Sequence, residues 1–261
     1  MSKKDEIIGM EGYNKYGSLM KIIKCINTNK ILILFSDYNY SQWSSYYNFQ
    51  RGAVKSPYCK TVFNIGYLGE GSYNKTSFPK IYSHWFAMLN RCYNACYINQ
   101  TSYLDCTVCE EWHNFQNFAK WYEENYYEVK DEIMHLDKDI LLKGNKIYSP
   151  QTCIFVPAII NMMFVSSKKT RGNYPIGISY HKHKHGNDKL DIRCNIIDKE
   201  KKKTKTIVLK SVPTDYPIEK AFNIYKNFKE EYIKEIADEY KCYIPIELYE
   251  ALYRYKVEIT D

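Results

Sequence analysis

Apolar and polar positions alternate in short runs over the first 72 residues. Leu19–Ile26 and Lys30–Phe35 have the length and composition of strands, and the turn Asn27-Thr28-Asn29 separates them. Five turn-forming residues punctuate the segment that follows, namely Gly52, Pro57, Gly66, Gly69 and Gly71. This pattern predicts a small β-rich module over residues 1–72.

A helical period replaces the alternation beyond residue 78. Pro79 suits a first helical turn, and apolar residues then recur near every 3.6 positions, at Tyr82, Trp85, Phe86, Leu89 and Cys92. A second helix is expected from about Glu110 to Tyr126. The chain then predicts a β-β-α unit, made of a strand near Met134, the turn Lys143-Gly144-Asn145, a strand at Cys153–Val156 and a short helix at Ala158–Phe164.

The last third of the chain predicts a sheet covered by a helix. Lys168–Tyr174 is polar and is interpreted as a linker. Three strands are expected after it, at Gly177–His185, Lys189–Asp198 and Lys205–Leu209, and Pro217 opens a helix that reaches about Tyr240. The tail Pro245–Asp261 also has helical spacing, and it either docks on a domain or forms a dimerisation element.

The expected fold class is therefore α+β in three parts. These are a β-rich N-terminal module at 1–72, a central helical and β-β-α core at 73–167, and a C-terminal three-stranded sheet packed on one helix at 168–261.

Charge is distributed unevenly along the 261 residues, whose net charge is +7. Residues 168–211 contain thirteen Lys and Arg against four Asp and Glu, a balance of +9 in one segment. Such a block is typical of a face that binds a polyanion, although Lys199–Lys205 alone also fits a solvated loop. An AT-rich coding sequence is the favoured explanation of the 27 tyrosines, although tyrosine also suits wet interfaces.

Nine cysteines and the absence of an apolar run near 18 residues indicate a protein of the reducing cytosol, without a membrane anchor.

The segment from Ser83 to Phe164 resembles phage and mobile-element proteins of the HNH (His-Me finger) endonuclease type. The matching words, in the family's order, are WFAMLNRCY at 85–93, VCEEW at 108–112, NF at 114–115 with NFA at 117–119, LDKDI at 136–140, GNKIYSP at 144–150 and CIFVP at 153–157. An ordered series over about a third of the chain is far more specific than any single word.

The resemblance implies a β-β-α metal nuclease, a hydrolase that uses Mg²⁺ or Mn²⁺. In the family a histidine deprotonates the attacking water, while a carboxylate and an amide or imidazole hold the metal at the scissile phosphate. Asp137 matches the carboxylate, but Lys138 stands where the family has histidine. A lysine with an ordinary pKa is a poor base at neutral pH, so this departure puts cleavage in doubt.

His135 is the nearest substitute for the missing base. On an extended strand His135, Asp137 and Asp139 would share one face, with Asn145 and Asn161 as further oxygen donors and Asp137 and Asn161 as the metal ligands. The alternative is structural, with the two aspartates capping a turn and His135 an ordinary surface residue.

The cysteines also permit a zinc interpretation. Cys92-x3-Cys96 and Cys106-x2-Cys109 have the spacing of ligands for Zn²⁺. The resemblance favours cysteine at Cys92, Cys109 and Cys153, either as a structural zinc site or as buried thiols.

Residues 173–240 resemble the APETALA2-like DNA-binding domain, which often follows such nuclease cores. The resemblance rests on Gly177-Ile178-Ser179-Tyr180, on Asp191-Ile192-Arg193 and on a helix from Pro217 that carries Ala221. It implies a sheet that enters the major groove of double-stranded DNA. We expect five residues on the exposed face, with Arg193 at a base edge and the lysines at phosphates: His181, His183, Lys184, Lys189 and Arg193. Because His181, His183 and His185 alternate, a metal on that strand is the alternative.

Three classes of function remain open on the sequence. The first is a phage or mobile-element DNA nickase, and the second is a DNA-binding or regulatory protein that keeps the nuclease scaffold without its chemistry. The third is a phage protein that inhibits a host defence factor by protein binding. Lys138 favours the second class over the first, and the basic segment favours both over the third.

Overall fold

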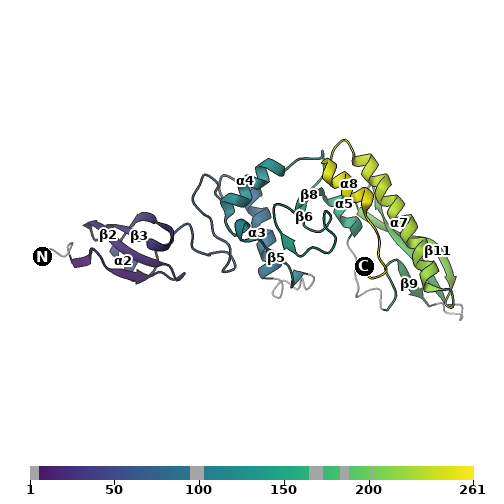
Figure 1. Ribbon diagram of the computed structural model, residues 1–261, viewed down its shortest axis with the longest axis horizontal. Helices are drawn as coiled ribbons and strands as arrows, with labels where there is room; N and C mark the ends of the chain where they lie inside the picture. Colours follow the sequence, from purple (N-terminus) through teal and green to yellow (C-terminus); the bar gives the residue numbers. More distant parts are fainter. Residues whose placement is uncertain (1–5, 95–102, 165–172, 183–187, 202) are drawn as a thin grey trace. The chain divides into compact units, whose positions relative to one another are not determined.

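The chain has the expected α+β fold (Figure 1). A computed structural model describes residues 6–94, 103–164, 173–182, 188–201 and 203–261. The chain divides into two compact units, the first made of residues 1–124 and 146–150, the second of 125–145 and 151–261. The second unit therefore contains both the β-β-α strands and the C-terminal sheet, while the three-part division at 72 and 167 stays a prediction.

The first unit begins with a four-stranded antiparallel sheet. Its strands pair in chain order: β1 (Glu11–Tyr13), β2 (Leu19–Asn27), β3 (Lys30–Phe35) and β4 (Tyr40–Ser44). One face of the sheet is buried, together with Phe49 of helix α2 (Tyr46–Gln50), through Met20, Ile22, Ile31, Ile33 and Phe35. The two central strands match the prediction, whereas β1 and β4 were not predicted, because each carries too few apolar residues to show alternation.

Helices form most of the regular structure in the rest of the first unit. Helix α3 (Pro79–Tyr93) packs Trp85 into the core, and the Trp85 Nε1 donates a hydrogen bond to the Trp112 carbonyl at 2.7 Å. The single helix expected from Glu110 to Tyr126 is wrong. A 3-10 turn η3 (Glu110–His113) precedes helix α4 (Phe115–Asn125), since the backbone at Asn114 bridges to Tyr67 instead of continuing the helix. Strand β5 (Thr107–Val108) pairs in parallel with β7 (Ile147–Tyr148).

The β-β-α unit opens the second compact unit. Strand β6 (Met134–Asp137) pairs antiparallel with β8 (Ile154–Pro157). Helix α5 (Ala158–Asn161) and the 3-10 turn η4 (Met162–Phe164) follow directly, close to the short helix that the sequence predicts.

The C-terminal sheet has the strand order β11-β10-β9, with β9 (Ile178–His181), β10 (Lys189–Asp198) and β11 (Lys203–Pro213). Helix α7 (Ile218–Tyr240) covers one face of it (Figure 1). Leu190, Ile192 and Cys194 of β10 point into this shared core. Gly177 enters β9 with φ +82°, and a Cβ there would overlap the ring of Tyr225, so this position requires glycine.

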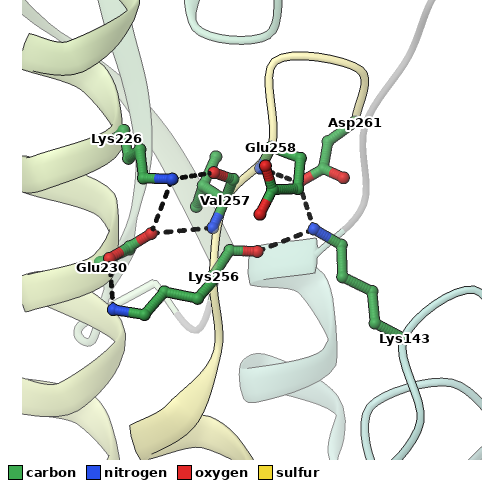
Figure 2. Close-up of polar contacts among 7 residues, drawn as sticks. All are labelled: Lys143, Lys226, Glu230, Lys256, Val257, Glu258 and Asp261. Atoms are coloured by element: carbon green, nitrogen blue, oxygen red, sulfur yellow. Dashed lines mark hydrogen bonds and ion pairs between the residues drawn. The ribbon is translucent and has the colours of Figure 1, made fainter.

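The chain ends on the second unit, as one of the two interpretations of the tail expects. Helix α8 (Ile246–Arg254) is followed by an extended segment whose Val257 is buried in the core beneath α7. Figure 2 shows the polar contacts of this segment. Lys226 donates to the Val257 carbonyl at 2.8 Å, and Lys143 donates to the Lys256 carbonyl at 2.7 Å and to an Asp261 carboxylate oxygen at 2.8 Å.

Among the helices in the described parts of the chain, none combines the length and the apolar character needed to cross a membrane.

Candidate functional site

The end of β6 carries the first group of predicted site residues. His135 is exposed on the strand between the buried Met134 and Leu136, so the strand alternates as expected. The Nδ1 of His135 lies 3.3 Å from the side-chain nitrogen of Asn161 on α5. The fold thus brings these two predicted residues together.

Asp137 ends the strand. Its Oδ1 accepts hydrogen bonds from the backbone N–H groups of Asp139 and Ile140, both at 2.8 Å. This carboxylate therefore caps a turn, and Asp139 does not continue the strand face as the alternation predicts. Burial, followed by repulsion from the Asp139 carboxylate, raises the pKa of Asp137 to about 6.

Lys138 is part of the same turn. Only 7% of its side chain is exposed, and its ammonium group donates to Asp139 Oδ2 at 2.9 Å and to the Asn145 carbonyl at 3.0 Å. The side-chain amide of Asn145 donates in return to the Lys138 carbonyl at 2.7 Å. Lys138 and Asn145 therefore close the loop between them, and a charged, paired lysine is no general base.

This cluster does not fit a divalent metal ion. Two carboxylates lie together, which suits a cation, but the ammonium group of Lys138 already supplies the positive charge there. One oxygen of Asp137 is occupied by backbone donors, and the amide of Asn145 is directed to a carbonyl. We derive no cleavage step through a metal at this position.

Asp137→Asn is expected to change how stability depends on pH. The pKa of Asp137 rises from 3.8 to about 6 on folding, so the native state binds its proton more tightly than the unfolded state. Ionisation of this carboxylate therefore lowers the free energy of unfolding. The loss is absent below about pH 4 and grows as the pH rises to about 6. The neutral amide does not carry this loss. In urea unfolding at a series of pH values, the variant should gain relative to the native protein across this window.

The control for this change is Asp215→Asn, at an exposed aspartate of the same compact unit. A difference between Asp137→Asn and the native protein that does not vary from pH 4 to 6 would contradict the assignment.

The predicted zinc cysteines come from separate elements of the chain. Cys92 on α3 and Cys109 before η3 belong to the first unit, and Cys153 before β8 belongs to the second. Burial raises the pKa of the Cys109 thiol. In the described ranges of the chain no three His, Cys, Asp or Glu side chains gather in a metal-binding group. Cys96 lies outside those ranges.

The C-terminal sheet presents a second group of predicted residues on the face away from α7. His181 of β9 pairs across the strands with Lys189 of β10, and directly paired residues share a face. Arg193 lies four residues further along β10, beyond a bulge in the pairing with β11, and 39% of its side chain is exposed. The fold therefore brings His181, Lys189 and Arg193 to one surface. His183 and Lys184, as well as His185, lie outside the described residues.

Asp191 organises this surface. Its carboxylate accepts a hydrogen bond from Arg193 at 2.6 Å and lies 3.0 Å from His181 Nδ1, while Ser211 of β11 donates to its other oxygen at 2.6 Å. Only 7% of its side chain is exposed. Burial alone would raise the pKa of Asp191, but the hydrogen bonds from Ser211, Arg193 and His181 outweigh burial and lower it to about 2. The carboxylate is therefore ionised at neutral pH and holds Arg193 in a defined position.

Sequence reasoning did not assign Asp191 a role at the site. The available signal is the alternation in Asp191-Ile192-Arg193, which places an acid beside the arginine on the outer face of a strand whose inner face is apolar. Ser211 gives no such signal, because its approach depends on the pairing of β11 with β10.

No family model, curated protein or solved structure matches this chain, so its function rests on the geometry of its own residues.

Proposed function

We propose that this protein binds double-stranded DNA through the outer face of its C-terminal sheet. The observation that carries the proposal is the partly exposed side chain of Arg193, which lies on the central strand and is held by the buried carboxylate of Asp191. An arginine whose direction is set before binding loses less freedom when it donates to a guanine edge.

The neighbours of Arg193 fit the same partner. His181 and Lys189 lie along the same face and would contact phosphates, which set the register of a protein on DNA without specifying its sequence. A sheet of this width can enter the major groove while a helix covers its back. The surrounding segment 168–211 has thirteen basic residues against four acidic ones, which suits a polyanion.

In this proposal the β-β-α unit is a scaffold of the HNH type that lacks nuclease chemistry. Lys138 replaces the base and ties the turn together, and the cluster does not fit a metal. The protein then acts as a DNA-binding or regulatory factor, and its resemblance to phage proteins suggests that it works inside a bacterial host cell. Metal-dependent nicking with Mg²⁺ or Mn²⁺ is the alternative that must be tested beside binding.

The test is a gel shift and a supercoiled-plasmid assay on the same DNA, with Mg²⁺, Mn²⁺ or a chelator. We expect a shift at low salt that weakens steeply as salt is added, and no nicking. Nicking that requires metal and disappears in Asp137→Ala would overturn the scaffold assignment. If the protein neither shifts nor nicks the DNA, the proposed function is wrong and a protein partner becomes the stronger candidate.

A further inference from the structure

The outer face of the N-terminal sheet is not explained by duplex binding at the other end of the chain. The register of the strands defines two rows of side chains on this face. Lys24, Leu32 and Trp43 form one row across β2, β3 and β4. The other row consists of Glu11, Lys21, Leu34 and Ser41.

This face exposes an aromatic ring. Trp43 has 45% of its surface exposed, although tryptophan is usually buried in a sheet. Leu32 beside it and Leu34 in the next row are half-buried, so the neighbours of the ring on this face are apolar. The opposite face of the same strands carries the buried core, so Trp43 is not needed to hold the sheet together.

Lysines surround this apolar strip. The ammonium group of Lys30 lies 5.4 Å from the centre of the Trp43 ring, and Lys24 is exposed at the other end of the Trp43 row. The acidic residue in the two rows is Glu11, and it is paired with Lys21 at 3.0 Å. The positive charge of Lys24 and Lys30 therefore has no acidic counterpart within these rows.

We propose that this face binds single-stranded DNA. An exposed aromatic ring with lysines on both sides matches the two needs of an unpaired strand, a surface on which a base can stack and cations along the backbone. A duplex cannot use the ring, because its base faces are already stacked. Leu32 and Leu34 offer no hydrogen-bond partner to a 2′-hydroxyl group, so deoxyribose fits beside the ring better than ribose.

The fluorescence of Trp43 can be used to detect binding at this face. The chain has four tryptophans, and Trp85, Trp112 and Trp121 are buried, so Trp43 is the exposed one. The protein is titrated with single-stranded oligothymidylate while its tryptophan fluorescence is followed. Iodide quenches the fluorescence of an exposed tryptophan ring, and we expect oligothymidylate to quench this same fraction of the signal. An equivalent duplex should not produce this quenching.

Affinity is then measured by the anisotropy of a labelled oligothymidylate. Trp43→Ala should weaken binding about 5- to 150-fold, because stacking on one ring contributes about 1–3 kcal/mol, and Trp43→Phe should retain most of the affinity. Lys24→Ala should weaken binding and lower the salt slope by about 0.7, whereas Lys60→Ala, an exposed lysine outside the sheet, should do neither.

Two results would overturn the proposal, namely equal affinity for native protein and Trp43→Ala, or equal affinity for oligothymidylate and oligouridylate. The proposed duplex interface is tested separately by Arg193→Ala, which should not change binding to the single strand. If the protein does not bind duplex DNA, the oligothymidylate titration still tests the N-terminal face independently.

Discussion

Arg193→Ala is expected to weaken binding to a duplex selected from random sequences by about tenfold to a hundredfold. Loss of one arginine that contacts a guanine edge costs about 1–3 kcal/mol, and it also relaxes the preference at that base pair. The side chain of Arg193 is partly exposed on the central strand of the sheet, and Asp191 holds it there. The measurement is a titration at fixed salt with the selected duplex and with single-base variants of it.

Three further variants show whether the effect belongs to this surface. Arg254→Ala removes an exposed arginine from α8 and should leave duplex affinity unchanged. Asp191→Asn keeps the shape of the side chain but releases the charge that holds Arg193, so it should reduce sequence discrimination more than affinity for random DNA. Lys189→Ala should lower the salt slope by about one phosphate contact. If Arg193→Ala and Arg254→Ala bind alike, the sheet does not read the duplex.

Asp139→Ala is expected to lower the free energy of unfolding by about 2–3 kcal/mol. The substitution removes the carboxylate that pairs with the buried ammonium group of Lys138, while the hydrogen bond to the Asn145 carbonyl remains. Removal of one partner from a buried ion pair usually costs about 3–5 kcal/mol. We expect a smaller loss because 46% of the Asp139 side chain is exposed and water can reach part of the site. Urea unfolding at neutral pH measures the difference.

The matched variant is Lys138→Met, which fills a similar volume without a charge. Replacing a buried charge with an apolar side chain is often close to neutral, so this variant should lose less than Asp139→Ala. The double variant should be more stable than Asp139→Ala alone, since it also removes the buried charge that Asp139 pairs with. A double variant as unstable as the sum of the two single changes would mean that Lys138 does not act through Asp139.

Regular elements with strong periodicity followed from the sequence. Strand β10 has the predicted bounds Lys189–Asp198, and α3 and α7 begin at or beside the expected prolines. Their residues alternate or recur so clearly that local pattern and tertiary packing agree on the same buried face. The same holds for the β-β-α order of β6, β8 and α5, in which each element buries apolar residues of its own.

Other features depend on contacts between residues far apart in the chain. The break before α4 arises because Asn114 bridges to Tyr67, and β1 is a strand because it pairs with β2. Neither partner is visible in a local window of sequence.

At the two candidate sites, too, some features followed from the sequence and others only from the tertiary structure. The sequence by itself placed Lys138 between two aspartates at the end of a strand, and it put Arg193 on a strand face. It did not show that Lys138 is buried against Asp139 and Asn145, because a carbonyl seven residues away comes within reach only when the loop closes. The role of Asp191 likewise required β9 and β11 to pair on both sides of β10, since three strands together supply its partners and bury its charge.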